Sequence, residues 1–296
     1  MKKNDLARLA WLLCLPFILL TECNKKIDKL PDESTLCSIR WITVPANNPT
    51  QIGPIDTIRF SYDSHGNPVT ISRLETATEL NDYVFWYDNQ HRLTDVIGTF
   101  FLPAPSGSGF DTWDKLYYTN GRVTLDTLFD FGYINGTRPI PLSIQDSVPR
   151  TRRISSYEYD SKGRISKIVD NFNGSFVEII IYAYDGKGNL ARLGVSGYFP
   201  QNPAPHDTLY TTISGYDNKV NVNRTNPIWQ FLDRDYSVNN RFTADQYNAI
   251  GLPVVIPGNR QSSFELPGPF SFLHSPFSLT IQYNCQLPGT GGAHSY

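Results

Sequence analysis

The stretch Tyr-Asp-Ser-Lys-Gly-Arg at residues 159–164 recurs along the chain, with close copies at 62–67 and 184–189. Each copy reads Tyr-Asp-x-x-Gly and then Arg or Asn, and an apolar segment follows it. Asp is favoured at the first position of a type I turn and Gly at the fourth. The Asp side chain can also bond the backbone two residues further on. The repeat therefore predicts a series of β-hairpins whose turns are formed by Asp and Gly.

Three degenerate copies of the phrase begin at Tyr87, Tyr118 and Tyr216. In the first of them His91 replaces the turn glycine, and His is among the few other residues that are enriched at positive φ. The second is shortened to Tyr-Thr-Asn-Gly-Arg, and Asn-Gly is a strong signal for a two-residue hairpin. The third contains no glycine, so its turn must differ. The strand-like segment 279–284 is a candidate truncated copy.

The segments that flank the turns have the pattern of strands. Ile58, Phe60 and Tyr62 alternate with polar residues, which is the period of a half-buried strand. After the turns the apolar residues are three apart, as in Ile165 and Ile168. An ideal strand would place such residues on opposite faces, so the spacing predicts a β-bulge after the turn glycine.

The copies at 62–67, 159–164 and 184–189 resemble the tyrosine-aspartate (YD) repeats of the RHS family. They are still more similar to the short YD-like repeats of secreted and lipid-anchored proteins of some Gram-negative bacteria. The resemblance covers roughly residues 56 to 226. Within this region only the short hairpin phrase is specific to such repeats. It implies a long curved antiparallel sheet, which in some RHS proteins coils into a shell around cargo. The copies here are fewer and less regularly spaced, so we expect an open or partly wrapped sheet.

The segment after the repeats predicts two short helices. Residues 226–232 begin with an Asn cap and have a Pro at the first helical position. Residues 243–251 begin with a Thr cap and end in Gly. Helices of two turns here would cover the concave face of a curved sheet. We therefore expect one all-β domain with this order of parts: signal peptide 1–22, tether and first strand 23–45, YD-like hairpin repeats 46–222, and capping segment with last strand 223–296.

The N-terminus has the pattern of an export signal. Lys2, Lys3 and Arg8 precede an apolar run, 9–20, of about 12 residues, whereas a membrane span needs ~20. The run ends in Leu-Thr-Glu-Cys, which resembles a bacterial lipoprotein cleavage box with Cys23 as the lipidated residue. An ordinary signal peptide cleaved elsewhere is the alternative. We expect a protein of the cell envelope that is anchored through lipid to the outer membrane or at the periplasmic face.

The charge balance gives no sign of a nucleic-acid partner. Loss of residues 1–22 would leave 23 basic and 26 acidic residues and change the formal charge from −2 to −3. Proteins that bind nucleic acid carry a clustered basic surface. The one basic cluster, Arg150, Arg152 and Arg153, interrupts a Pro-rich stretch, and we interpret it as a solvated loop.

Two cysteines, Cys37 and Cys285, remain when Cys14 leaves with the signal and Cys23 takes lipid. Export to an oxidising compartment permits a disulfide between them, which would tie the first strand to the last. Two unpaired buried thiols are the alternative. The chain has no zinc-like CxxC or Cys/His spacing, so we expect neither a metal nor another cofactor.

The chain has no motif that predicts catalysis. It contains no Gly-rich phosphate loop before a helix, no GxSxG and no HExxH. His65 and His91 lie in predicted turns. Asp111 and Asp114 form a carboxylate pair, but a glycosidase needs two carboxylates at a set separation, which this spacing does not fix. We expect no enzymatic activity, with a glycan-active enzyme as a remote alternative.

The remaining signal is a group of aromatic and acidic residues at the end of a turn-rich spacer, 101–113. Its aromatic rings would stack on a sugar and its carboxylates would bond hydroxyl groups. The candidate ligand-binding residues are Phe110, Asp111, Trp113 and Asp114, with Trp229 as a second aromatic candidate or a core residue. The leading expectation is a non-catalytic, lipid-anchored envelope protein with a binding or scaffold role toward a polysaccharide or protein. A carbohydrate-binding accessory lipoprotein is the alternative.

Overall fold

The computed structural model describes residues 37–44, 56–74, 82–99, 109–136, 138–144, 148–149, 151–202, 207–258, 278–285 and 294–295. All described residues belong to one compact unit, Glu33–Tyr296. The predicted signal peptide and Cys23 lie outside the described residues. Within the described part, no helix has the length and apolar character that a membrane span requires.

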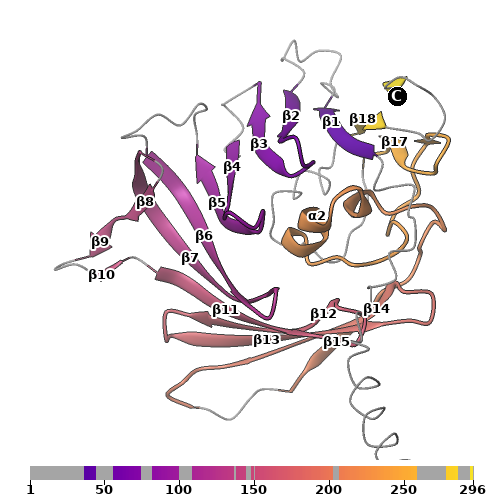
Figure 1. Ribbon diagram of the computed structural model, residues 1–296. Helices are drawn as coiled ribbons and strands as arrows, with labels where there is room; N and C mark the ends of the chain where they lie inside the picture. The colour runs from indigo at the N-terminus through magenta and orange to yellow at the C-terminus, as the bar shows by residue number, and fades with distance from the viewer. Residues whose placement is uncertain are drawn as a thin grey trace, which may run out of the picture. The chain divides into compact units, whose positions relative to one another are not determined.

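Antiparallel strands make up most of the regular structure (Figure 1). The strands of the main sheet are β1 (Cys37–Val44), β2 (Asp56–Tyr62), β3 (Pro68–Arg73), β4 (Asp82–Tyr87), β5 (Leu93–Thr99), β6 (Gly109–Thr119), β7 (Arg122–Asn135), β8 (Arg138–Pro141), β11 (Thr151–Tyr159), β12 (Ile165–Phe172), β13 (Phe176–Tyr184), β14 (Leu190–Tyr198), β15 (Leu209–Thr212), β16 (Gln246–Tyr247), β17 (Pro253–Ile256), β18 (Leu279–Cys285) and β19 (His294–Ser295). Outside it lie the pair β9 (Ser143–Ile144) and β10 (Val148–Pro149), the 3-10 helix η3 (Val222–Thr225) and the helix α2 (Pro227–Leu232).

The main sheet has 17 strands among the described residues and largely follows the order of the chain. Each strand from β1 to β7 pairs with the next, β7 also pairs with β11, and the series continues to β15. At the other end β18 pairs with both β1 and β17. Figure 1 shows the strands bent around α2, with β2–β5 above it and β11–β15 below. The predicted curved antiparallel sheet is confirmed.

The turns have the geometry that the repeated phrase predicts. In the fourth copy the Asp160 Oδ1 atom accepts hydrogen bonds from the amides of Lys162 (2.9 Å) and Arg164 (3.0 Å). The amide of Gly163, at φ 81°, donates to the Asp160 carbonyl at 3.0 Å. The Arg164 Nε atom donates to the second carboxylate oxygen at 2.8 Å. The copies at Asp63, Asp88 and Asp185 repeat the backbone arrangement.

A β-bulge follows each of these turns at the same position. In the fourth copy Tyr159 pairs with Ile165 and Glu158 with Lys167, so Ser166 is the additional residue. As a result Ile165 and Ile168 are both fully buried although they are three residues apart. The predicted bulge is confirmed, and the equivalent extra residues in the other copies are Val69, Thr94, Thr124, Ala191 and Val254.

Six tyrosines of the repeat bond their hairpin to the preceding one through a backbone carbonyl, whereas the Tyr247 hydroxyl donates to the Asp217 side chain. The Tyr184 hydroxyl donates to the carbonyl of Ile165, the first residue after the preceding turn, at 3.2 Å. Arg164, the last residue of that turn, lies over the Tyr184 ring with its Cζ atom 3.9 Å from the centroid. Five further tyrosines make the same hydrogen bond at 2.6 to 2.8 Å: Tyr87, Tyr118, Tyr159, Tyr216 and Tyr283. Each copy is thus bonded to its neighbour, as in other repeat architectures.

The prediction of a helix at 243–251 is wrong, because this segment forms a seventh hairpin of the repeat. Here Asn248 replaces Asp, and its Oδ1 atom accepts from the amides of Ile250 (3.1 Å) and Leu252 (2.9 Å). Gly251 adopts φ 85° in the turn between β16 and β17. Asn can replace Asp because the turn needs only the acceptor oxygen that both side chains offer. The hairpin series therefore extends beyond residue 222.

The sixth copy is completed by a residue from another part of the chain. The Asp217 amide donates to the Asn240 carbonyl at 3.1 Å, and the Asn240 side chain donates to Asp217 Oδ2 at 2.9 Å. In the first copy Asn67 makes both of these bonds to Asp63. The residues between Asp217 and Asn240 are consequently an insertion within one turn of the repeat, and this insertion contains η3 and α2. The turn without glycine does differ, as the sequence predicts.

Helix α2 is the predicted helix at 226–232, and it covers the concave face of the sheet. Its Trp229 side chain is fully buried, and the ring makes edge contacts with Phe60 (5.8 Å between centroids) and Phe85 (5.7 Å). The Asn226 cap accepts from the Ile228 amide and donates to the Gly66 carbonyl at 3.0 Å. The insertion thereby places an aromatic residue at the centre of the main hydrophobic core.

Cys37 and Cys285 are joined by a disulfide, which decides between the two alternatives that the sequence leaves open. Their Cα atoms are 4.0 Å apart, and the two residues are direct partners in the pairing of β1 with β18. The bond closes a separation of 248 residues. It fixes the strand at the start of the described chain to one near its end.

We predict that Asp160→Ala lowers the free energy of unfolding by ~2 kcal/mol, because the turn amides of Lys162 and Arg164 lose their acceptor. Asp160→Asn should lower it less, since Asn248 performs the same task in the seventh copy. Urea denaturation of both variants, with Lys162→Ala as a control in the same turn, measures the difference. Equal losses in Asp160→Asn and Asp160→Ala would contradict the role of the Oδ1 atom.

Candidate functional site

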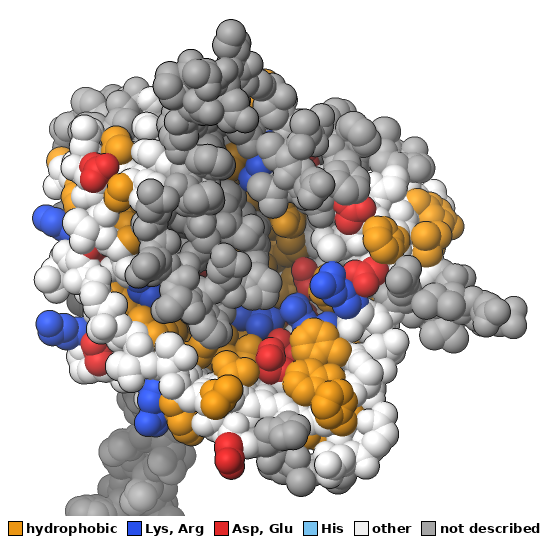
Figure 2. All heavy atoms as spheres, turned by 180° about the vertical axis from the view of Figure 1, so that it is seen from behind, with side chains coloured by type: hydrophobic (Ala, Val, Ile, Leu, Met, Phe, Trp, Pro, Cys, Tyr) orange, Lys and Arg blue, Asp and Glu red, His pale blue; other side chains and the backbone are white. Residues whose placement is uncertain are grey.

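A cavity of about 170 Å³ lies on the concave side of the sheet, between α2 and the strands from β4 to β7 and β11. Figure 2, which views the molecule from behind, shows a hollow where basic, acidic and hydrophobic side chains meet. A cavity of this size has room for several water molecules or one small ligand. The cavity is lined by Tyr83, Val96, Thr112, Asp114, Leu116, Asp126, Leu128, Arg153, Tyr157, Phe231, Leu232 and Arg234.

The two-residue alternation of a strand determines which side chains of β6 face the cavity. Thr112, Asp114 and Leu116 are each two residues apart, and all three line the cavity. On the paired strand β7, Asp126 is the partner of Leu116 and lines it as well. Asp114 and Asp126 are therefore diagonal neighbours on one face of two paired strands.

Two arginines lie among three carboxylates at this site, and we call Asp114, Asp126, Arg153, Asp170 and Arg234 the charge cluster. The Arg153 Nη2 atom lies 3.6 Å from Asp114 Oδ1 and 3.9 Å from Asp126 Oδ1. Its Nε atom lies 3.8 Å from Asp170 Oδ1. Arg234 Nη1 donates to Asp170 Oδ2 at 3.3 Å. Every carboxylate of the cluster thus has a guanidinium near it.

Several buried atoms of the charge cluster have no hydrogen-bond partner within the described part of the chain. They are the Oδ1 atoms of Asp114, Asp126 and Asp170 and the Nε atom of Arg153. The ion-pair distances of 3.6 to 3.9 Å are too long for hydrogen bonds. A buried polar atom without a partner costs ~1–3 kcal/mol. Of these residues Asp114, Asp126 and Arg153 line the cavity, so a molecule within it can bond to them.

Asp114 is the titratable group of this cavity near neutral pH. Burial, and then the charge of Asp126, raise the pKa of Asp114 to about 7, although Arg153 and Arg234 act against this rise. At pH 7 the carboxyl group is therefore present both as an acceptor and as a protonated donor. Burial raises the pKa of Glu178 on β13 as well, with Asp170 adding to the effect.

Two residues hold Asp126 and Asp170 in place. The Tyr157 hydroxyl donates a hydrogen bond to Asp126 Oδ2. Burial alone would lower the pKa of Arg234, but Tyr157 and Asp170 raise it, so Arg234 keeps its positive charge. The cluster is therefore held by donors from β11 and from the insertion that contains α2.

A second buried polar group stabilises the insertion itself. The Asn223 side chain donates to Asp233 Oδ2 at 2.6 Å, and Arg241 Nη2 lies 3.2 Å from Asp235 Oδ2. The Asn221 side chain also donates to Asp235. These bonds tie the two ends of the insertion together, and none of the five residues lines the cavity. We therefore assign this group a structural role.

The structure places the predicted ligand-binding residues in three different surroundings. The Trp113 ring is 6% exposed and stacks on Phe129 at 4.6 Å between centroids, with Phe110 6.2 Å away. Its Nε1 atom donates to Asp95. Trp113 and Phe110 belong to a small hydrophobic cluster separate from the main core, whereas Asp114 lines the cavity. Trp229 lies in the main core. Asp111 does not line the cavity, and burial raises the pKa of its carboxyl group.

Most of the charge cluster could not be recognised from sequence. The interpretation of Arg153 as part of a solvated loop is wrong, because it lies in β11 with a side chain 14% exposed. Asp126, Asp170 and Arg234 come from strands and an insertion that only the tertiary structure brings together. One available signal is the alternation of β7, which places Asp126 on the same side as Leu128.

The sequence matches no family model, and no curated protein is significantly similar to it. The resemblance to YD repeats therefore stays a prediction, which is based on the repeated phrase at 62–67, 159–164 and 184–189.

Proposed function

We propose that this is a non-catalytic protein of the cell envelope, anchored through lipid at Cys23, that binds a small hydroxyl-rich ligand such as a saccharide unit. The binding site would be the cavity beside the charge cluster. The observation that supports this most directly is a set of buried atoms on Asp114, Asp126 and Arg153 that have no hydrogen-bond partner among the described residues, and all three residues line the cavity.

The chemistry of the cavity suits a hydroxyl-rich molecule. Asp114 and Asp126 offer acceptor oxygens and the Arg153 guanidinium offers a donor, and a hydroxyl group can both donate and accept. Tyr83, Phe231 and other apolar side chains form part of the wall, where the apolar face of a sugar ring would pack. A few polar groups within a largely apolar lining are typical of small-molecule sites.

The charges also favour a neutral ligand. Three carboxylates and two guanidinium groups are within 3.9 Å of a partner of opposite charge. At neutral pH part of the Asp114 population is protonated, because its pKa is raised to about 7. The cluster is then close to balanced. A strongly charged ligand would leave one sign in excess in a buried site, which costs free energy.

A glycan-active enzyme is the second candidate, and one observation favours it. Asp114, with its raised pKa, is a diagonal neighbour of Asp126 in the sheet, and two carboxylates close together can act as acid and base. Against this, Tyr157 donates to Asp126 and Arg153 lies near both carboxylates. These contacts hold the pair in place and favour binding over turnover.

The anchoring part of the proposal predicts an acylated Cys23 at the N-terminus of the mature chain. Intact-mass measurement of protein extracted from membranes should give the mass of residues 23–296 plus lipid. Cys23→Ser should abolish this addition and release the protein into the soluble fraction. An unmodified N-terminus in the wild-type protein would refute the anchor and leave the binding proposal to its own test.

For the binding site, we predict that saccharides from a broad panel raise the melting temperature of the wild-type protein. Asp114→Leu should weaken that binding roughly 10-fold or more, because a hydrogen bond to a carboxyl group contributes ~1.5–3 kcal/mol. Asp95→Asn is the matched control, since Asp95 accepts from Trp113 and does not line the cavity.

Thermal-shift screening followed by calorimetry on both variants gives the comparison. Absence of any saccharide binding, or equal losses in Asp114→Leu and Asp95→Asn, would contradict the assignment. Cleavage of a bound oligosaccharide, detected by mass spectrometry, would instead favour the enzyme.

The raised pKa of Asp114 also predicts how stability depends on pH. The folded protein retains this proton to about pH 7, whereas an unfolded Asp loses it near pH ~3.9. The folded state binds more protons between these values, so stability falls as the pH rises from 4 to 7. Urea denaturation at pH 5, 6, 7 and 8 should show a shallower fall for Asp114→Asn than for the wild type. The same slope in both proteins would contradict the raised pKa.

A further inference from the structure

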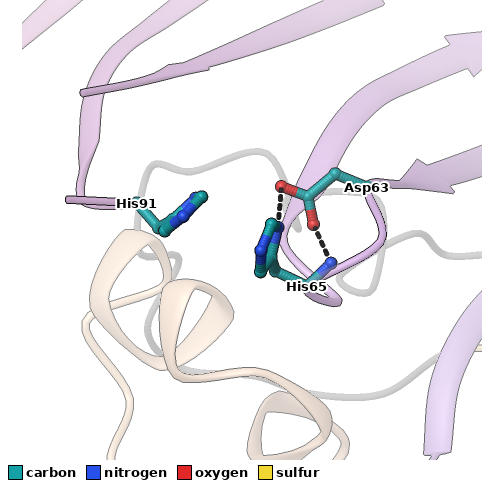
Figure 3. A group of neighbouring side chains, drawn as sticks. All are labelled: Asp63, His65 and His91. Carbon is teal, nitrogen blue, oxygen red and sulfur yellow. Dashed lines mark hydrogen bonds and ion pairs between the residues drawn. The ribbon is translucent and has the colours of Figure 1, made fainter. Parts of the chain in front are cut away.

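Two histidines occupy the tips of neighbouring hairpins. His65 is the fourth residue of the first copy, and His91 is the fifth residue of the second. Because β3 pairs with β4, the turns of these two copies are adjacent. The two imidazole rings are 4.0 Å apart between centroids and are tilted by 35°. Figure 3 shows the rings side by side, with the Asp63 carboxylate next to His65.

One ligand atom from each of Asp63, His65 and His91 lies within 4.8 Å of the other two. Tetrahedral Zn²⁺ with bonds of 2.0 to 2.2 Å places its ligand atoms ~3.3 Å apart. His65 Nδ1 is already 3.8 Å from Asp63 Oδ2. The His65 side chain is 55% exposed and His91 is exposed too, so small rotations of the two rings bring the three atoms to metal-binding distances.

Asp63 is the fixed ligand of the group. Its Oδ1 atom accepts from the amides of His65 (2.8 Å) and Asn67 (2.9 Å). Its Oδ2 atom accepts from the Asn67 side chain at 3.0 Å. A carboxylate oxygen has more than one acceptor position, and Oδ2, which is the oxygen nearer to His65 Nδ1, keeps one of them for a metal.

The two histidines depart from the residues that their positions favour elsewhere in the repeat. The fifth position is Gly in four other copies and adopts φ between 80° and 91°, whereas His91 adopts φ 59°. A residue with a Cβ atom pays roughly 1 kcal/mol for this conformation. The fourth position is Gln90, Lys162 or Lys187 in three other copies. The departures occur at two turns that are neighbours in the sheet, so the side chains meet.

We propose that Asp63, His65 and His91 bind a divalent transition metal ion of the Zn²⁺ type. Two imidazoles and one carboxylate suit Zn²⁺, Ni²⁺ or Cu²⁺ and are a poor match for Mg²⁺ or Ca²⁺. With three protein ligands on an exposed surface, a fourth position of the metal stays open to water or to an outside ligand. The ion would also link two hairpin tips next to α2, since Asn226 donates to the Gly66 carbonyl.

This site differs from the sequence-based expectation of no metal, and the reason is the spacing of its ligands. Metal motifs are recognised by short spacings within one turn or helix. Here the ligands come from separate copies of the repeat, and strand pairing brings them together. The proposal is independent of the cavity and of the lipid anchor.

The test is a titration of the untagged protein with Zn²⁺ by calorimetry, together with Co²⁺ followed by visible absorption. The expected result is one equivalent of metal per chain and a melting temperature that rises with Zn²⁺ concentration. His91→Gly removes a ligand and supplies the residue that this turn position favours, so it should weaken binding at least 10-fold without lowering the metal-free melting temperature. His65→Gln supplies the residue found at the same position of the second copy and should weaken binding similarly.

Lys187→Gln, at the fourth position of the fifth copy, is the matched control and should bind metal as the wild type does. Failure of the wild-type protein to bind stoichiometric Zn²⁺ or Co²⁺ would overturn the proposal. Unchanged affinity in the His65→Gln, His91→Gly double variant would also overturn it, because the metal would then be bound elsewhere on the chain.

Discussion

The structure depends on one interaction, in which a single side-chain oxygen accepts two backbone hydrogen bonds within a turn. Asp160 Oδ1 shows the arrangement, with the amides of Lys162 and Arg164 as its donors. This contact fixes the point at which the next strand begins and so the position of the bulge beyond it. The bulge then decides which side chains reach the concave face. Tyr184 donates to the carbonyl of Ile165, whose position the preceding turn fixes. A displacement of one turn would therefore also displace the acceptor to which the next hairpin is bonded.

The charge cluster costs free energy, whereas the hydrogen bonds of the turns stabilise the fold. The Asp126 and Asp170 carboxylates are buried and Asp114 is partly buried, and Arg153 approaches all three without forming hydrogen bonds. Replacing such a group by apolar residues is often neutral or stabilising. The hairpin scaffold, the disulfide between Cys37 and Cys285 and the Trp229 core provide the stability that tolerates it. A polar group that is costly to bury, held within a well-bonded scaffold, supports the binding site that we propose.

The local features of the fold could be predicted from sequence, and the long-range ones could not. Asp, Gly and the three-residue spacing after the turn predict the hairpins and bulges, because each of these signals acts within a few residues. The sequence does not predict the hairpin at 246–256, because Asn248 replaces Asp, while the Thr at 243 and Gly251 match the ends of a helix. The sequence predicts Asp114 as a candidate binding residue, but it does not predict the partners of Asp114. Arg153 approaches Asp114, and Asp170 and Arg234 approach Arg153 and each other, only after three parts of the chain have folded together.

The insertion between Asp217 and Asn240 has a wider consequence for how such a repeat can diversify. The two residues close the sixth turn with the bonds that Asp63 and Asn67 make within five residues. The turn therefore does not require its ends to be close in sequence, only that an Asp and an Asn meet. Any turn of the series could in principle be opened in this way and extended by new chain without disturbing the strands on either side. In this protein one such extension supplies both the core tryptophan, Trp229, and a wall of the candidate binding cavity. The repeat thus accepts a long additional segment at a turn, and that segment can cover the concave face of the sheet.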